Sequence, residues 1–319
     1  MTMATHATAH ATAHVLEVFT LLLIGMYVTA VLDVILERAV AGCALRMREA
    51  AVRPLRGTAL LLLQKRSTTE RPDSENWAFA PALLGASAMT ALSLVPFGEN
   101  GALWDVSSGI VYFGAAMALV MVAVYLEGWA SNSVFPLIGA YRFVAQALSY
   151  EMPLALVLIA AALPAESLAI GDIVRSQAHM WNVARQPLGL PLYLIAAVGL
   201  AFWGPLALPD ANDLAGGTRA ELSGIALLLW RGAHLSIVVA ASAMGAAVFL
   251  GGWLGPWLPP AAWMTIKTVA LILTILVTGH TFSRARLEWF VRVAWTILIP
   301  AALVDVFASG VVVLWGKGH

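Results

Sequence analysis

Five polar side chains stand before an almost purely apolar stretch of the chain. They are Arg142, Gln146, Ser149, Tyr150 and Glu151, and the apolar stretch covers residues 152–164. An ionisable residue at or inside a membrane-spanning helix is costly and marks function by default. A carboxyl group held there, away from bulk water, can take up and release a proton. The pattern therefore indicates a proton path rather than a scaffold.

Four more ionisable residues fall inside or at the edges of apolar runs, namely Asp33, Glu127, Lys267 and Asp305. Asp33 and Asp305 lie near the ends of their runs, where local pairing is the alternative to function. Glu127 precedes a glycine and a tryptophan, so an interfacial position is its alternative. Lys267 lies about one turn inside its run, where we expect it to be buried against a carboxylate or backbone carbonyls and to carry function.

Composition indicates the environment that surrounds these residues. The chain has 319 residues, of which 61% are hydrophobic and 11% charged, and its mean hydropathy is +0.84. Soluble domains carry about 25% charged residues. The sequence therefore predicts an all-α, polytopic membrane protein.

Eight apolar runs approach the roughly 20 residues that a helix needs to cross a bilayer. The runs are continuous rather than alternating, which favours helices over a β-barrel. The predicted spans are residues 15–36, 77–96, 107–128, 146–164, 188–208, 232–254, 262–282 and 289–315.

The predicted organisation is a disordered tail, residues 1–14, followed by a single membrane domain, residues 15–319. The tail carries histidines four residues apart, for which metal binding on a helix is the alternative. Residues 37–76 form a basic cytoplasmic loop and residues 209–231 a second one. Within the first loop, residues 41–64 mix arginines with apolar residues, which predicts an interfacial helix or, alternatively, a groove wall for an amphipathic ligand.

Lysine and arginine counts set the predicted orientation. Fourteen of the 18 basic residues lie on the side of the first loop and one, Lys267, lies in a span. The other three lie on the opposite side: Arg175, Arg185 and Lys317. Cytoplasmic loops carry the excess of positive charge. We therefore expect both termini outside the cytoplasm.

Several classes of site are excluded or disfavoured. Cys43 is the single cysteine, so an intrachain disulfide and a cysteine-based cluster are excluded. No Gly-x-Gly-x-x-Gly, Walker or His-Glu-x-x-His motif occurs, which predicts no nucleotide site and no metal site. A formal net charge of zero gives no indication of a nucleic-acid partner. Redox chemistry must come from partner subunits.

The polar stretch belongs to a longer segment that resembles a known family. "GWASNSVFPLIGAYRFVAQALSYEMPLAL", residues 128–156, is similar to the hallmark of the H subunit of NADH-quinone oxidoreductase, the subunit 1 family of respiratory complex I. Further segments follow in the family's order, so the resemblance covers about residues 15–315. They are "SLAIGDIVRSQ" (167–177), "WNVARQPLG" (181–189), "RAELSG" (219–224), "FLGGW" (249–253), "KTVALILTILV" (267–277) and "FSRARLEWFVRVAW" (282–295).

The resemblance implies a multi-pass subunit of the plasma or inner membrane, beneath the hydrophilic arm of a proton-translocating NADH:quinone oxidoreductase. It implies no redox centre, no iron–sulfur cluster and no catalytic residue in this chain. Quinone would bind at the interface with the hydrophilic quinone-site subunits, and other membrane subunits would be partners. The membrane anchor of a formate hydrogenlyase-type hydrogenase is the alternative. An independent transporter is a third possibility, which the lack of an obvious internal repeat disfavours.

The resemblance, taken residue by residue, and the positions of the polar residues predict two sets of site residues. The predicted quinone chamber contains Glu37, Arg38, Arg142, Gln146, Glu221, Arg284 and Arg286. The predicted proton path contains Glu127, Glu151, Asp210, Asp213 and Lys267.

The sequence departs from the family pattern after the fifth predicted span. Leu200, Trp203 and Ala207 stand where the family has a glutamate, an arginine and an aspartate, and Gly279 replaces an arginine late in the seventh span. Losing both charges of a pair is milder than losing one, because no orphan charge is left buried. We interpret the chain as a divergent member, in which Glu127, an acid that the family does not normally carry, partly substitutes for the lost carboxylates.

Overall fold

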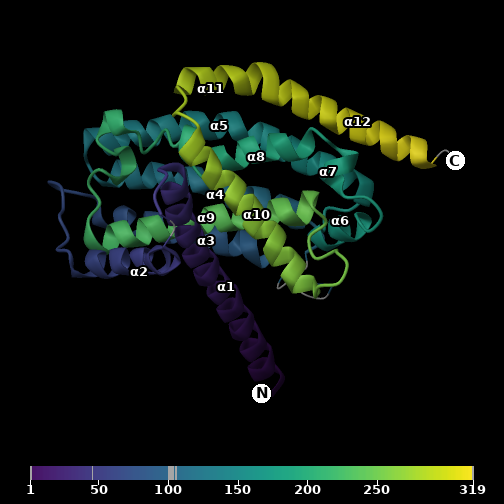
Figure 1. The fold of residues 1–319 in the computed structure, drawn as a ribbon, viewed down its shortest axis with the longest axis horizontal. Helices are drawn as coiled ribbons and strands as arrows, with labels where there is room; N and C mark the ends of the chain where they lie inside the picture. The colour runs from purple at the N-terminus through teal and green to yellow at the C-terminus, as the bar shows by residue number, and fades with distance from the viewer. Residues whose placement is uncertain (1, 45, 100–103, 105, 318–319) are drawn as a thin grey trace.

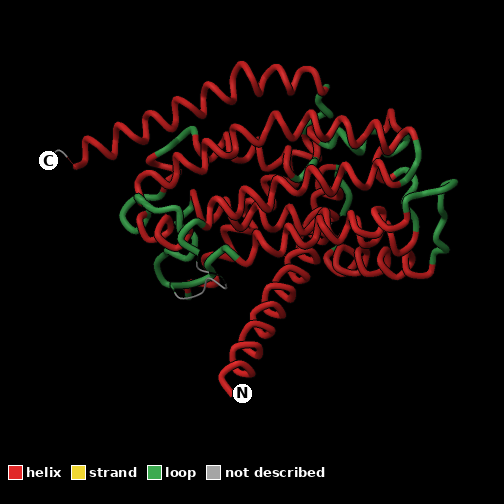
Figure 2. The backbone as a smooth tube through the Cα atoms, turned by 180° about the vertical axis from the view of Figure 1, so that it is seen from behind, coloured by secondary structure: helices red, strands yellow, loops and turns green. Residues whose placement is uncertain are grey.

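The computed structural model describes residues 2–44, 46–99, 104 and 106–317 and contains no strand in that part of the chain, which confirms the all-α prediction. Its loops gather at the two ends of a helix bundle (Figures 1 and 2). The helices are α1 (Thr2–Val40), α2 (Met47–Leu63), α3 (Ser74–Ser93), α4 (Gly109–Ala130), α5 (Val134–Ala162), α6 (Ile170–Ser176), α7 (Asn182–Arg185), α8 (Gly189–Leu200), α9 (Gly224–Phe249), α10 (Pro260–Thr281), α11 (Leu287–Val293) and α12 (Ile299–Lys317).

Six helical segments are long and apolar enough to cross a membrane, within the described residues. They correspond to six of the eight predicted spans. The other two predicted spans contain α3, which has 20 residues, and α8, which has only 12. The chain is therefore a polytopic membrane protein.

Helix α9 forms the centre of the bundle. In its most apolar stretch 89% of the residues are buried, against 22% in α1. Residues 240–247 of α9 are alanine, serine, glycine and one methionine. Small side chains let neighbouring backbones approach closely, which is how helices associate without a hydrophobic driving force from water. Helices α3, α10 and α1 pack against this face.

The bundle has two distinct ends (Figure 1). One end holds α2, residues 64–73 and the loop after α8, and we call it the arginine-rich end. The opposite end holds α6 and α7. Hydrogen bonds tie distant loops together at the arginine-rich end: the Asp73 amide donates to the Ala130 carbonyl at 2.9 Å, and the Ser67 amide donates to the Ser223 hydroxyl at 2.7 Å.

Helix α8 is shorter than predicted. The sequence predicted a span over residues 188–208, but α8 ends at Leu200 after 12 residues, a length of about 18 Å. Phe202 and Gly204 have positive φ values of 35° and 52°, and Pro205 lacks an amide donor, so the helix does not continue. The loop that follows therefore covers residues 201–223 rather than 209–231, since α9 already begins at Gly224.

Helix α5 is longer than predicted. Its polar residues favoured a start at residue 146, but the helix begins at Val134, so Arg142 and Gln146 lie two to three turns inside it. A helix continues through such residues where their polar atoms find partners.

The predicted interfacial helix within residues 41–64 exists as α2, and most of its side chains are exposed. At the start of the chain, the backbone of residues 2–14 continues α1, where the sequence predicted a disordered tail.

Tight packing around α9 gives a matched pair of glycine substitutions. A Cβ atom at Gly245 would lie 2.6 Å from the Tyr193 ring, whereas one at Gly114 meets nothing within 4 Å. We expect Gly245→Ala to lower the free energy of unfolding by about 1–3 kcal/mol through overpacking. Gly114→Ala should leave stability unchanged or raise it slightly. Thermal unfolding in detergent measures both, and equal effects of the two variants would contradict the packing described here.

Candidate functional site

The loop between α8 and α9, residues 201–223, folds around a buried carboxylate, and we call it the α8–α9 loop. Asp210 is 2% exposed. Its carboxylate accepts a hydrogen bond from the Thr218 hydroxyl at 2.5 Å and pairs with the Arg219 Nε at 2.9 Å. Burial raises the pKa of Asp210, while the Arg219 charge and the Thr218 hydrogen bond act in the opposite direction.

A glycine pair closes the loop onto this carboxylate. Gly216 and Gly217 have φ values of 101° and 58°, and the Thr218 amide donates to the Pro209 carbonyl at 3.2 Å. A Cβ atom at Gly217 would collide with the Pro209 carbonyl. The conformation that brings Thr218 to Asp210 therefore requires glycine at this position.

Helix α5 holds the loop from the other side. The Arg142 guanidinium donates to the Asp213 carboxylate at 2.8 Å, and the Ser133 hydroxyl donates to the Glu221 carboxylate at 2.8 Å. The Arg142 hydrogen bond lowers the pKa of Asp213. The structure thus joins Arg142, predicted for the chamber, to Asp213, predicted for the proton path.

Glu127 is fully buried near the same loop. It lies in the last turn of α4, and the Trp77 indole donates to its Oε1 at 2.5 Å. Its Oε2 finds no hydrogen-bond partner among the described residues. Asp210 lies within electrostatic reach, and the Arg66 guanidinium lies 5.4 Å from the centroid of the Trp77 ring. Glu127 is therefore buried within the protein at the end of α4.

The other residues of the opening motif face the interior of the bundle or its edge. Gln146 is fully buried and donates to the Gly199 carbonyl at 2.6 Å, in the last turn of α8. Tyr150 is also fully buried and packs against Gly199. Glu151 is half-buried, with an Oε1 that finds no partner among the described residues. Gln146 and Tyr150 thus attach α5 to the short helix α8.

Glu37 and Arg38 both bind α2 rather than each other. Glu37 pairs with Arg53 at 2.6 Å, and Arg38 pairs with Glu49 at 2.7 Å. Together they fasten α2 along the end of α1, which places these two predicted chamber residues at the arginine-rich end.

Arg284 and Arg286 lie in the loop between α10 and α11, and both are exposed. The Ala285 amide donates to the Pro205 carbonyl at 2.8 Å, which binds this loop to the α8–α9 loop. Arg284 lies within electrostatic reach of Asp210 and Asp213. Two loops and helix α5 therefore converge here with both signs of charge.

Lys267 lies elsewhere. It donates to the carbonyls of Gly252 and Leu254 at 2.9 and 2.6 Å, and its ammonium lies 4.4 Å from the centroid of the Trp181 ring. It is therefore buried against backbone carbonyls, one of the two predicted surroundings. It lies 12 residues before Gly279, about 18 Å along the α10 axis, toward the α6 end.

Two histidines connect helices to their neighbours, and neither was predicted as a site residue from the sequence. His234 of α9 is buried, hydrogen-bonds the Ala201 carbonyl at 2.6 Å and stacks on Phe202 with a centroid distance of 3.9 Å. His280 of α10 pairs with Asp33 of α1 at 2.8 Å. A histidine inside an apolar run was the available signal in both cases.

The departures from the family pattern meet in space. The Trp203 Nε1 lies 2.6 Å from where a Cβ atom of Gly279 would stand, and the backbone of Gly204 also approaches Gly279 closely. An indole thus packs against a glycine at the two positions where the resemblance implies arginines.

A sequence profile of the family described as NADH dehydrogenase matches residues 16–310. The chain belongs to this family. It is 32% identical to the second NADH-quinone oxidoreductase H subunit of Syntrophobacter fumaroxidans, over 83% of each chain. It is 35% identical to the first H subunit of Rhodopseudomonas palustris over 76% of each chain, and 33% identical to the first H subunit of Geobacter metallireducens over 74% of this chain and 76% of that one.

These identities confirm the resemblance and make the chain a divergent member of the H-subunit family. Such a protein is a component of an oxidoreductase complex and not a catalyst by itself. Trp203 lies within the α8–α9 loop, and Gly279 of α10 packs against it.

The Asp210–Arg219 pair can be tested with a double-mutant cycle. Arg219→Met leaves Asp210 buried without its cation, and we expect a loss of about 1–3 kcal/mol. The loss should stay below the roughly 3–5 kcal/mol of a fully buried pair, because the Arg219 side chain is 36% exposed. Adding Asp210→Asn should restore part of the stability, measured by thermal unfolding. Arg286→Met is the exposed control, and strictly additive effects would contradict the pairing.

The Arg142–Asp213 pair predicts a pH dependence. The pKa of Asp213 is lowered in the folded protein, so its contribution is complete above the unfolded pKa of about 3.9 and is lost as pH falls through the folded pKa. We expect the melting-temperature difference between the unmodified protein and Asp213→Asn to be present near neutral pH and to vanish in acid. A difference that grows toward acid pH would contradict this assignment.

Proposed function

We propose that this chain is the membrane subunit of a complex I-type NADH:quinone oxidoreductase that forms the quinone chamber with the hydrophilic arm and begins the proton path. The observation that carries the proposal is the convergence of the α8–α9 loop, α5 and the α10–α11 loop at the arginine-rich end. The proposal places this end in the cytoplasm, because the excess of arginine and lysine lies there.

Quinone binding is the first part of the proposal. A quinone presents two carbonyl oxygens that accept hydrogen bonds, and a guanidinium offers five donors in a fixed fork. Arg38, Arg142, Arg284 and Arg286 supply such donors at one end of the bundle, with Glu37 and Glu221 among them. Gln146 orders the wall between α5 and α8. Partner subunits would close the chamber from the cytoplasmic side.

Proton transfer is the second part. Glu127, Asp210 and Asp213 lie close together at the end where quinone reduction would consume protons. Glu127 has one carboxylate oxygen without a partner among the described residues and can therefore exchange a proton through water. Glu151 continues the route deeper along α5. A role for Lys267 in the path remains a prediction, since its contacts stabilise the loop at the α6 end.

The native complex gives the first test. Affinity purification through a tag on this chain should bring down hydrophilic subunits that bind NADH and iron–sulfur clusters. Partners that carry a nickel-site hydrogenase would instead support the anchor of a membrane-bound hydrogenase, and recovery of this chain alone would contradict both.

Glu127 gives the second test. We expect Glu127→Gln to lower the number of protons translocated per NADH at least twofold while NADH oxidation by the complex continues. Proton uptake into membrane vesicles measures this. Glu75→Gln, an exposed carboxylate in the first turn of α3, is the matched control. Unchanged proton translocation in Glu127→Gln would reject the proposal that Glu127 takes over the role of the carboxylates that this chain lacks.

A further inference from the structure

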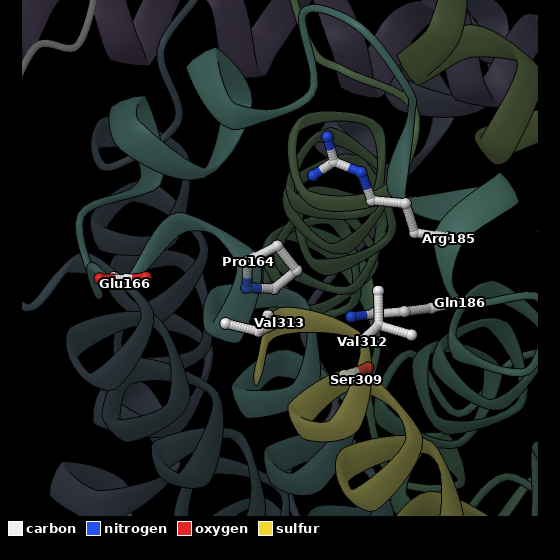
Figure 3. A pocket seen from close by; sticks show the side chains of 7 residues that line it. All are labelled: Pro164, Glu166, Arg185, Gln186, Ser309, Val312 and Val313. Atoms are coloured by element: carbon white, nitrogen blue, oxygen red, sulfur yellow. The ribbon is translucent and has the colours of Figure 1, made fainter. Parts of the chain in front are cut away.

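A second polar site lies at the opposite end of the bundle from the α8–α9 loop. A cavity of about 290 Å³ opens between α12, the end of α5 and α7 (Figure 3). Its lining residues are Pro164, Glu166, Arg185, Gln186, Ser309, Val312 and Val313. None of them belongs to the predicted chamber or proton path.

Buried oxygen atoms in and beside this cavity lack partners. Gln186 and Ser309 are 3% and 5% exposed, and neither the Gln186 Oε1 nor the Ser309 Oγ finds a hydrogen-bond partner among the described residues. The Gln186 Nε2 donates to the Ala160 carbonyl at 2.6 Å, which fixes the amide with its oxygen free. An unsatisfied buried oxygen costs about 1–3 kcal/mol, so such atoms are expected to have a donor.

Asp305 lies one helical turn before Ser309 and does not itself line the cavity. It is four residues before Ser309 on α12, so the two share a helix face about 6 Å apart along the helix axis. Asp305 is 3% exposed, and its Oδ2 also lacks a partner among the described residues. Asp305 and Gln186 both lie close to Gly189, since a Cβ atom there would lie 3.3 Å from the Asp305 Oδ2 and 3.4 Å from the Gln186 Cβ.

We infer that this cavity holds water that reaches the Asp305 carboxyl from the α6 end, which makes Asp305 a proton-exchange site on the side opposite to the quinone chamber. Three oxygen acceptors without donors fit water, since each molecule offers two donors and needs two to four polar partners. The cavity is far larger than the volume of one water. The carboxylate takes a proton from the cavity water and returns it there, so no other reactant is needed.

Few other titratable groups surround Asp305, which lies beside the lining residues Gln186 and Ser309. Glu166 and Arg185 line the cavity, and the Arg185 guanidinium also donates to the Ser176 carbonyl at 2.8 Å. Helix α8 contributes Tyr193, whose hydroxyl donates to the Ala241 carbonyl at 2.7 Å. Helix α5 carries no titratable residue after Glu151.

Thiol labelling tests the water path without any use of the NADH reaction. In a Cys43→Ser background, Ser309→Cys in the native complex should react with a membrane-impermeant maleimide added from the non-cytoplasmic side. Val304→Cys, exposed on the same helix, and Ala302→Cys, fully buried, are the controls. We expect Ser309→Cys to react at least tenfold faster than either control, since the reagent needs a hydrated thiolate.

Asp305 itself is tested by the pH dependence of that labelling. A neighbouring carboxylate disfavours the thiolate, so adding Asp305→Asn should shift the labelling midpoint of Ser309→Cys to lower pH by half a unit or more. No labelling, no shift, or labelling that starts only after detergent extraction would each overturn the inference, the last by indicating that lipid covers the cavity. Both tests can fail while the proposed function holds, and the proposed function can fail while both tests succeed.

Discussion

An ionised side chain inside this bundle has little bulk water around it, so it needs partners in the protein or bound water, and this constraint shapes the chain. Isolated charges in a low-dielectric interior cost several kcal/mol, whereas a paired and hydrogen-bonded charge is tolerated. Asp210 has Arg219 and Thr218, Asp213 has Arg142, and Lys267 has two carbonyls. The Arg142–Asp213 pair also joins two segments that lie 71 residues apart in the sequence. The polar contacts therefore both stabilise the fold and set the position of its loops.

The early end of α8 is the main consequence for the candidate site. Because the helix stops at Leu200, the chain must return to the arginine-rich end without helical hydrogen bonds. The α8–α9 loop does so with short turns, positive-φ glycines and the Asp210 ion pair. Irregular backbone at membrane depth is tolerated only where protein or a water-lined cavity covers it. Trp203 and Gly279 supply that cover here by close packing.

The sequence predicted the helical class, the membrane setting and the family, because hydropathy and motif order are local properties of the chain. It also selected Arg142, Glu127 and Asp210 as candidate site residues, and their roles stay predictions. It did not predict that Arg142 pairs with Asp213, 71 residues away, or that Glu37 and Arg38 bind α2, because such pairs depend on tertiary packing. The start of α5 was placed 12 residues late for the same reason: its polar residues disfavour a helix in lipid but not against satisfied partners. His234 and His280 were missed because a single histidine in an apolar run carries little signal.

The central claim is that the arginine-rich end of this protein meets the quinone. Photoaffinity labelling of the native complex with an azido-quinone, followed by peptide mapping, tests it most directly. The account predicts labelled peptides from the end of α1, the α8–α9 loop and the α10–α11 loop, and competition by unmodified quinone. Labelling confined to other subunits, or to the α6 end of this chain, would contradict it.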